Sequence, residues 1–167
     1  QPASQQSGSG RLQRRACWVA AFLLGPAFWQ FTSAGWVHAK ALVAQKLIAH
    51  SWQLAQRKGV APRPWPCAAT RPIARLTVAK SGVDLYVLEG ASGRSLAFGP
   101  GHVSGTAAPG SGGNSVIVAH KDTHFAFLKN LIDDDEIRVE DARGKVGRYR
   151  VREVTIVGRS ETRVLDP

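Results

Sequence analysis

The stretch Asn114-Ser-Val-Ile-Val-Ala-His120-Lys-Asp-Thr-His124-Phe125 joins a short β-branched run to two histidines. Residues 116–118 are apolar and β-branched, which is typical of a buried strand, and polar residues follow closely. We therefore predict a strand at Ser115–Ala119 that delivers His120 to a loop. An imidazole held at a strand end is a candidate acid/base because histidine titrates near neutral pH.

Three interpretations of this stretch stay open on the residues alone. In the first, His120 is a general acid or base beside a cleft. In the second, His120, Asp122 and His124 bind a metal, although a His-x-x-x-His pair favours metal binding mainly when it is helical, and here it lies in a strand and a loop. In the third, both histidines are structural and hydrogen-bond the neighbouring loop.

The surrounding sequence predicts mainly β structure. Short apolar or alternating runs are separated by glycine-bearing breaks, and a loop-rich stretch covers residues 89–113. This pattern is typical of a β-barrel or sandwich. One short helix is expected at Phe125–Leu131, and the strands besides Ser115–Ala119 are expected at Ile73–Ala79, Val83–Leu88, Glu136–Glu140 and Arg148–Val157.

The N-terminal part predicts a membrane anchor. Three arginines at positions 11, 14 and 15 precede an apolar run from Ala16 to about Trp36, which is long enough to cross a bilayer. A signal peptide has the same order of basic and apolar residues. The run exceeds a usual signal core, so an uncleaved transmembrane helix with a cytoplasmic N-terminus is favoured. The expected divisions are a disordered basic segment at 1–15, this helix at 16–36, an amphipathic stalk helix at 37–60, a Pro-rich linker at 61–71 and a β domain at 72–167.

The amphipathic helix carries an apolar stripe predicted to contain Val43, Leu47, Ile48 and Leu54, and it is expected to end at Gly59. It could continue the membrane helix as a stalk, lie on the bilayer surface, or pack on the domain. His50, with no second ligand at helical spacing, is interpreted as an ordinary surface residue.

The charge distribution favours a membrane over nucleic acid as the partner. The formal net charge is +10, yet every acidic residue lies at Asp84 or later, and the first 69 residues hold eight Lys and Arg. These cations flank the apolar segment, as juxtamembrane cations do. We therefore expect no nucleic-acid binding. The basic residues beyond Gly144 alternate along a predicted strand and are interpreted as a solvated face.

Two cysteines are present, Cys17 in the apolar run and Cys67 in the linker. A disulfide between them is not expected, and neither has metal-ligand spacing to a second cysteine. The acidic cluster Asp133–Glu136 is interpreted as a solvated turn rather than a calcium site. No metal and no cofactor are predicted.

A set of ordered motifs resembles the sortase family, in the form found in Gram-negative bacteria. After the membrane helix and the Pro-Trp-Pro linker, the motifs are Ile73-Ala-Arg-Leu-Thr-Val78, Gly82-Val-Asp-Leu85, Leu96-Ala-Phe-Gly-Pro-Gly-His102, Gly113-Asn-Ser-Val-Ile-Val-Ala-His120, Asp122-Thr-His-Phe125 and Val164-Leu-Asp-Pro167. Sortases are membrane-bound cysteine transpeptidases with an eight-stranded β-barrel. Their active site holds a histidine at this strand end, a cysteine in a Thr-Leu-x-Thr-Cys strand and an arginine on the last strand.

The resemblance implies that His120 is the catalytic histidine. Ala119 stands where sortases often have glycine, and Lys121 where arginine is common. The printed chain stops at Pro167, before counterparts of the cysteine and the arginine, and Cys67 lacks the Thr-Leu-x-Thr context. The resemblance therefore implies a barrel without its last two strands that is inactive as given. His102 is interpreted as a loop-fixing residue, and Phe125 and Phe127 as core.

The implied function is cleavage of an LPXTG-like sorting signal at the C-terminus of a protein substrate, with transfer of the acyl product to an amine. The implied location is the inner (cytoplasmic) membrane, with a single span and a periplasmic catalytic domain. The alternative is a non-catalytic sortase-like envelope protein that binds a peptide or partner.

Overall fold

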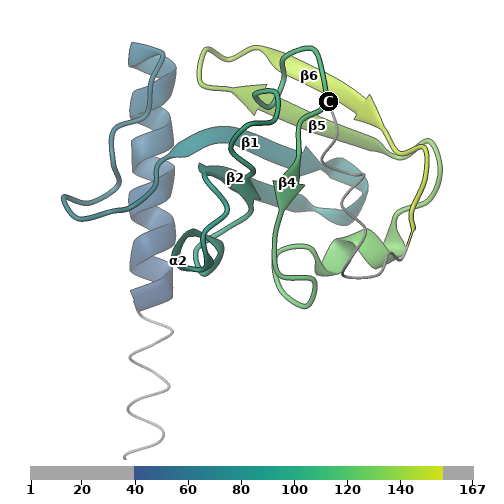
Figure 1. Ribbon diagram of the computed structural model, residues 1–167, viewed down its shortest axis with the longest axis horizontal. Helices are drawn as coiled ribbons and strands as arrows, with labels where there is room; N and C mark the ends of the chain where they lie inside the picture. Colours follow the sequence, from purple (N-terminus) through teal and green to yellow (C-terminus); the bar gives the residue numbers. More distant parts are fainter. Residues whose placement is uncertain (1–39, 156–167) are drawn as a thin grey trace, which may run out of the picture. The chain divides into compact units, whose positions relative to one another are not determined.

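The computed structural model describes residues 40–155, which contain a six-stranded sheet (Figure 1). The strand order is β4-β3-β2-β1-β5-β6. All neighbouring pairs are antiparallel except β2 and β3, which are parallel. The strands are β1 (Pro72–Val78), β2 (Val83–Glu89), β3 (Gly101–His102), β4 (Ile117–Val118), β5 (Glu136–Asp141) and β6 (Val146–Arg150).

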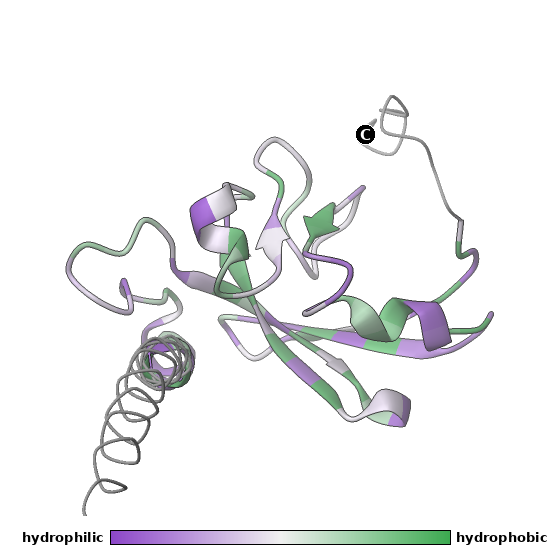
Figure 2. Cartoon of the chain, turned by 90° about the horizontal axis from the view of Figure 1, so that it is seen from below, coloured by the Kyte–Doolittle hydropathy of each residue, from purple (hydrophilic) through white to green (hydrophobic). Residues whose placement is uncertain are grey.

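Strand β1 organises the core because it pairs with β2 on one side and β5 on the other. Its residues alternate strictly between buried and half-buried, so Ala74, Leu76 and Val78 face the core. Val87 of β2 and Val139 of β5 join them. This two-residue period is the signature of a strand with one buried face, and Figure 2 shows alternating bands along the strands.

The sheet curves so that its two edge strands contribute to one hollow. Ile117 of β4 and Tyr149 of β6 line the same cavity of about 250 Å³, together with Leu76, Ile137 and Val139. Strands β4 and β6 stand at opposite ends of the strand order and are not paired with each other. The described residues therefore form a half-barrel, which confirms the predicted mainly β class.

The first hairpin has the predicted form. A 3-10 turn at Ala79–Ser81 links β1 to β2, and Gly82 follows it with a φ of 61°. Glycine adopts this left-handed conformation without a steric penalty. The hairpin turn predicted at residues 80–82 is thus confirmed.

Two elements inside the predicted loop 89–113 were missed. The helix α2 (Gly93–Leu96) begins at Ser92, whose hydroxyl accepts the N–H of Ser95. Strand β3 follows, and a Cβ placed on its Gly101 would lie 2.4 Å from the carbonyl oxygen of Gly90. Elements of two and four residues are too short to show a hydropathy period, so the pattern gave no signal for them.

The third and last predicted strands were too long. Strand β4 covers only Ile117–Val118 because its partner β3 is two residues long. Strand β6 begins at Val146 and ends at Arg150, where its pairing with the first residue of β5 ends. Val151 instead exchanges backbone hydrogen bonds with Asp134 and Asp135. The predicted helix at 125–131 is a 3-10 helix, η2 (Ala126–Asn130).

The described part of the chain opens with a helix over residues 40–58, and from Val43 onward it belongs to the same compact unit as the sheet. Its buried face consists of Ala44, Ile48, Ser51, Trp52 and Ala55. The ring of Trp52 lies 6.1 Å from that of Tyr86 in β2.

The predicted apolar stripe of this helix was wrong at two positions. Val43 is 57% exposed and Leu47 is 37% exposed, whereas Ile48 is fully buried and Leu54 half-buried. Of the three placements left open, residues 43–58 take the one in which the helix packs on the domain. Gly59 ends the helix with a φ of 75°, as expected.

The predicted basic segment 1–15 and transmembrane helix 16–36 lie outside the described residues. Within residues 40–155 none of the helices has both the length and the apolar character needed to span a bilayer.

Candidate active site

His120 lies two residues beyond β4 and is exposed. Its carbonyl oxygen accepts the backbone N–H groups of Thr123 at 3.3 Å and Phe125 at 3.1 Å. These two bonds fold residues 120–125 into a tight turn, so the backbone that carries the imidazole is held at both ends. The structure thus places a titratable side chain, open to solvent, two residues beyond the edge strand β4.

His124 lies in the same turn and is half-buried. Burial lowers the pKa of His124 below its usual value of 6.5, and the proximity of His120 lowers that pKa further. Two imidazoles this close disfavour simultaneous protonation. The fold therefore disfavours the protonated form of His124, and it brings both predicted histidines into one electrostatic environment.

Aromatic residues after the turn tie it to the core. The rings of Phe125 and Phe127 lie 5.8 Å apart in an edge-to-face arrangement. Phe127 packs against the main hydrophobic core, as the sequence predicted. The turn that carries His120 consequently rests on the same core as β1.

Two carboxylates of the acidic loop before β5, Asp134 and Asp135, form ion pairs with basic side chains of the domain. The Asp135 carboxylate accepts the backbone N–H of Ile132 and is paired with Lys80 at 2.9 Å, and these contacts hold the pKa of Asp135 below its usual value. Asp134 pairs with Arg150 at 2.7 Å. Within residues 40–155 no group of three or more His, Cys, Asp or Glu side chains is arranged to hold a metal ion.

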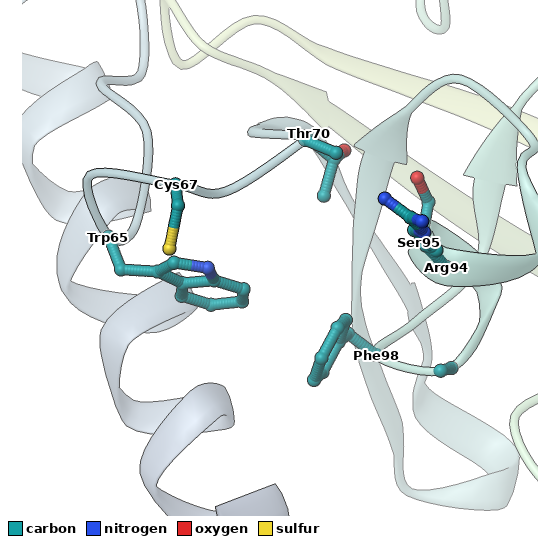
Figure 3. Close-up of a pocket in the computed structure, with 8 residues that line it drawn as sticks. Trp65, Cys67, Thr70, Arg94, Ser95 and Phe98 are labelled. Carbon is teal, nitrogen blue, oxygen red and sulfur yellow. The ribbon is translucent and has the colours of Figure 1, made fainter.

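Cys67 lies in a separate hollow of about 380 Å³ (Figure 3). Trp65 and Phe98 face each other edge-on across part of it, with ring centres 5.3 Å apart, and Arg94 lies beyond. His120 is not among the residues that line this hollow. The exposed thiol and the histidine therefore do not share this hollow.

A model of the sortase domain matches residues 76–167, which is more than half of the chain. The chain belongs to the sortase family. The matched region contains β4, the turn at 120–125 and both histidines of the site.

Solved sortase structures agree with this assignment. Sortase A from Corynebacterium diphtheriae is 26% identical with a TM-score of 0.53, covering 60% of this chain and 49% of its own. Sortase E from Streptomyces avermitilis is 27% identical with a TM-score of 0.53, covering 57% and 66%. The comparison with curated proteins found no match.

A sortase D5 transpeptidase from Clostridium perfringens has a TM-score of 0.59 and covers 72% of this chain and 78% of its own. Its identity of 23% supports the fold alone. The chain spans about half the length of the C. diphtheriae sortase A structure.

Sortases are cysteine transpeptidases, and the catalytic role of His120 remains a prediction in this sortase. The sequence contains no cysteine between Ile73 and Pro167. Sequence analysis found the histidines of the turn, and its interpretation of His102 as a loop-fixing residue is confirmed, because the His102 ring makes two hydrogen bonds to the loop that precedes β4.

Proposed function

We propose that this protein is a membrane-anchored sortase-type transpeptidase of the Gram-negative kind, in which His120 is the acid/base. The observation that carries the proposal is the exposed imidazole of His120 just beyond the edge strand β4, inside the region that matches the sortase domain. The apolar run 16–36 with its arginine flank supports a single-span anchor in the inner (cytoplasmic) membrane and a periplasmic catalytic domain.

The proposed reaction is acyl transfer from a protein that ends in an LPXTG-like signal. A cysteine thiolate attacks the carbonyl carbon of the Thr–Gly bond, and His120 in its protonated form gives a proton to the departing amine. The resulting thioester is attacked by an acceptor amine, which releases the thiol. An arginine stabilises the negative charge that develops on the carbonyl oxygen in each step.

The thiol and the arginine of this mechanism have no assigned residue in the printed sequence. Residues 73–167 contain no cysteine, and Cys67 lines a hollow that His120 does not. We therefore assign neither the thiol nor the arginine to residues 73–167 and expect no turnover from these residues alone.

The decisive experiment is to read the gene beyond the codon for Pro167 and to assay the encoded protein. A Thr-Leu-x-Thr-Cys strand followed by an arginine, with cleavage of a fluorogenic LPXTG peptide in the presence of an amine, would support the proposal. His120→Ala should then abolish cleavage. The control is His50→Ala, at an exposed position of the helix over residues 40–58, and it should leave cleavage unchanged.

An immediate stop codon would contradict the transpeptidase proposal. The absence of cysteine from residues 73–167 would then favour the alternative, a non-catalytic envelope protein that binds a peptide or partner. Peptide binding without an acyl-enzyme would be the mark of that function.

A further inference from the structure

His102 lies directly across the sheet from the strand that leads to His120. In the register of β3 and β4 it pairs with Ile117, and in that of β2 and β3 it pairs with Glu89. Gly101 allows this position, because any Cβ there would collide with the carbonyl oxygen of Gly90 at 2.4 Å. The backbone of His102 is thus pressed against β2, which fixes where its ring can reach.

The ring of His102 donates a hydrogen bond into the following loop. Its Nε2 lies 2.9 Å from the carbonyl oxygen of Ala107 and 3.0 Å from the hydroxyl oxygen of Thr106. A carbonyl oxygen only accepts, so Nε2 carries a proton. Both the neutral ring with its proton on Nε2 and the charged ring meet this requirement.

Thr106 connects His102 to Val116, the residue that leads into β4. Its hydroxyl donates to the carbonyl oxygen of Val103 at 2.8 Å, and its oxygen accepts the backbone N–H of Val116 at 3.2 Å. With the His102 N–H as a further donor, the one hydrogen and two lone pairs of the hydroxyl are all used. Val116 is the residue immediately before β4.

Backbone hydrogen bonds close the loop around this pair of side chains. Val103 donates to Val116 at 2.9 Å, and Ala107 donates to Asn114 at 2.9 Å. Strands β3 and β4 have only two residues each, and so short a ladder is weak by itself. The side-chain bonds from His102 and Thr106 supply the additional restraint.

We propose that His102 is a positioning residue that, through Thr106, holds β4 in register and so sets the place of His120. The importance of this placement for catalysis rests on the proposed function. The claim that His102 and Thr106 hold β4 in register is independent of the proposed function, because it concerns only the loop 103–116 and the strand that follows.

The test uses the full 167-residue chain in a mild detergent and two substitutions of one residue. His102→Leu removes the donor, whereas His102→Gln offers an amide N–H at a similar reach. Loss of these partly buried hydrogen bonds should speed hydrogen exchange at the Val116 and Ala107 amides about tenfold in the leucine variant. The glutamine variant should restore most of the protection.

Nuclear magnetic resonance of the imidazoles gives a readout that general loss of stability would not imitate. In His102→Leu the ring resonances of His120 should shift or broaden, while the amide protection of Leu76 in β1 stays at its original value. Thr106→Val removes the hydroxyl with little change of shape and should reproduce the Val116 effect. Ser92→Ala, which removes the cap of α2 in the neighbouring loop, is the matched control and should leave His120 and Val116 unchanged.

Unchanged Val116 exchange and unchanged His120 resonances in His102→Leu would overturn the proposal. Equal behaviour of the leucine and glutamine variants would overturn it too, as would the same effect from Ser92→Ala. The absence of transpeptidase activity in the protein would contradict the proposed function but would not alter these measurements, so the two failures are distinguishable.

Discussion

Trp52 is a buried side chain that joins the helix over residues 40–58 to the sheet. It is 2% exposed, and it contacts Tyr86 of β2 at a ring separation of 6.1 Å. Ala55 and Ala61 complete the same small cluster. We predict that Trp52→Ala destabilises the whole domain rather than releasing the helix alone.

The size of the effect follows from the buried area. An aromatic side chain buries ~150–250 Å², worth roughly 4–6 kcal/mol at ~25 cal/mol per Å². Part of this is retained by the remaining Cβ and by relaxation, so the expected loss is about 3–5 kcal/mol, the usual range for such truncations. A domain of this size has a free energy of unfolding of about 5–15 kcal/mol.

Trp52→Phe separates packing from polarity. The indole Nε1 is buried and has no hydrogen-bond partner among the described residues. An unsatisfied buried donor costs about 1–3 kcal/mol, and phenylalanine removes that cost while giving up part of the contact area. The two terms oppose each other, so the net change should stay within about 1 kcal/mol.

Urea unfolding followed by far-ultraviolet circular dichroism measures these differences. The control is Val43→Ala, a truncation on the same helix at a position that is 57% exposed, with an expected change below about 0.5 kcal/mol. If Trp52→Ala lowers the free energy of unfolding by less than about 1 kcal/mol, or by no more than Val43→Ala does, packing of Trp52 does not stabilise the folded domain.

Three further substitutions test the site and its surroundings. Gly101→Ala forces a Cβ to within 2.4 Å of the Gly90 carbonyl oxygen, so it should lower the free energy of unfolding by about 1–3 kcal/mol in urea titrations, and an unchanged midpoint would refute the close approach. Because the pKa of His124 is lowered in the folded state, the unfolded state binds more protons below about pH 6.5, and the stability of the domain should fall as the pH drops through that value. His124→Asn should flatten this pH dependence in thermal melts from about pH 7.5 to about pH 5. An equal slope in both proteins would contradict the lowered pKa of His124. Ser115→Ala removes a hydroxyl that is buried without a partner among the described residues, and thermal melts should show it to be neutral or stabilising by up to about 1 kcal/mol, not destabilising.

The N-terminal helix shows where sequence reasoning reached its limit. Its helical character and its end at Gly59 were predictable from helix formers and a terminating glycine. The stripe that includes Val43 and Leu47 was equally apolar, yet the side buried in the structure is centred on Ile48 and Trp52. Which side faces the domain depends on Tyr86 of β2 and Ala142 after β5, which pack against the Trp52 cluster and are not part of the helix sequence.

The candidate active site also has features that the sequence predicted and features that it did not. A β-branched run that ends in His120 indicated a strand end and a loop, because strand propensity and polarity are local properties. The length of β4 could not be predicted from the local sequence, because β4 pairs only with the two residues of β3. The lowered pKa of His124 and the hydrogen bonds of His102 likewise depend on neighbours brought together by folding.

The sequence by itself determined the mainly β class, the first hairpin with Gly82, and the family motifs that include His120, since each is written in a short run of residues. Only the tertiary structure decided how the sheet curves, which helix face is buried, and how His102 and Thr106 reach the strand before His120. The physical reason is range: propensities and turns act over a few residues, whereas register, burial and side-chain hydrogen bonds join residues that are distant in the chain.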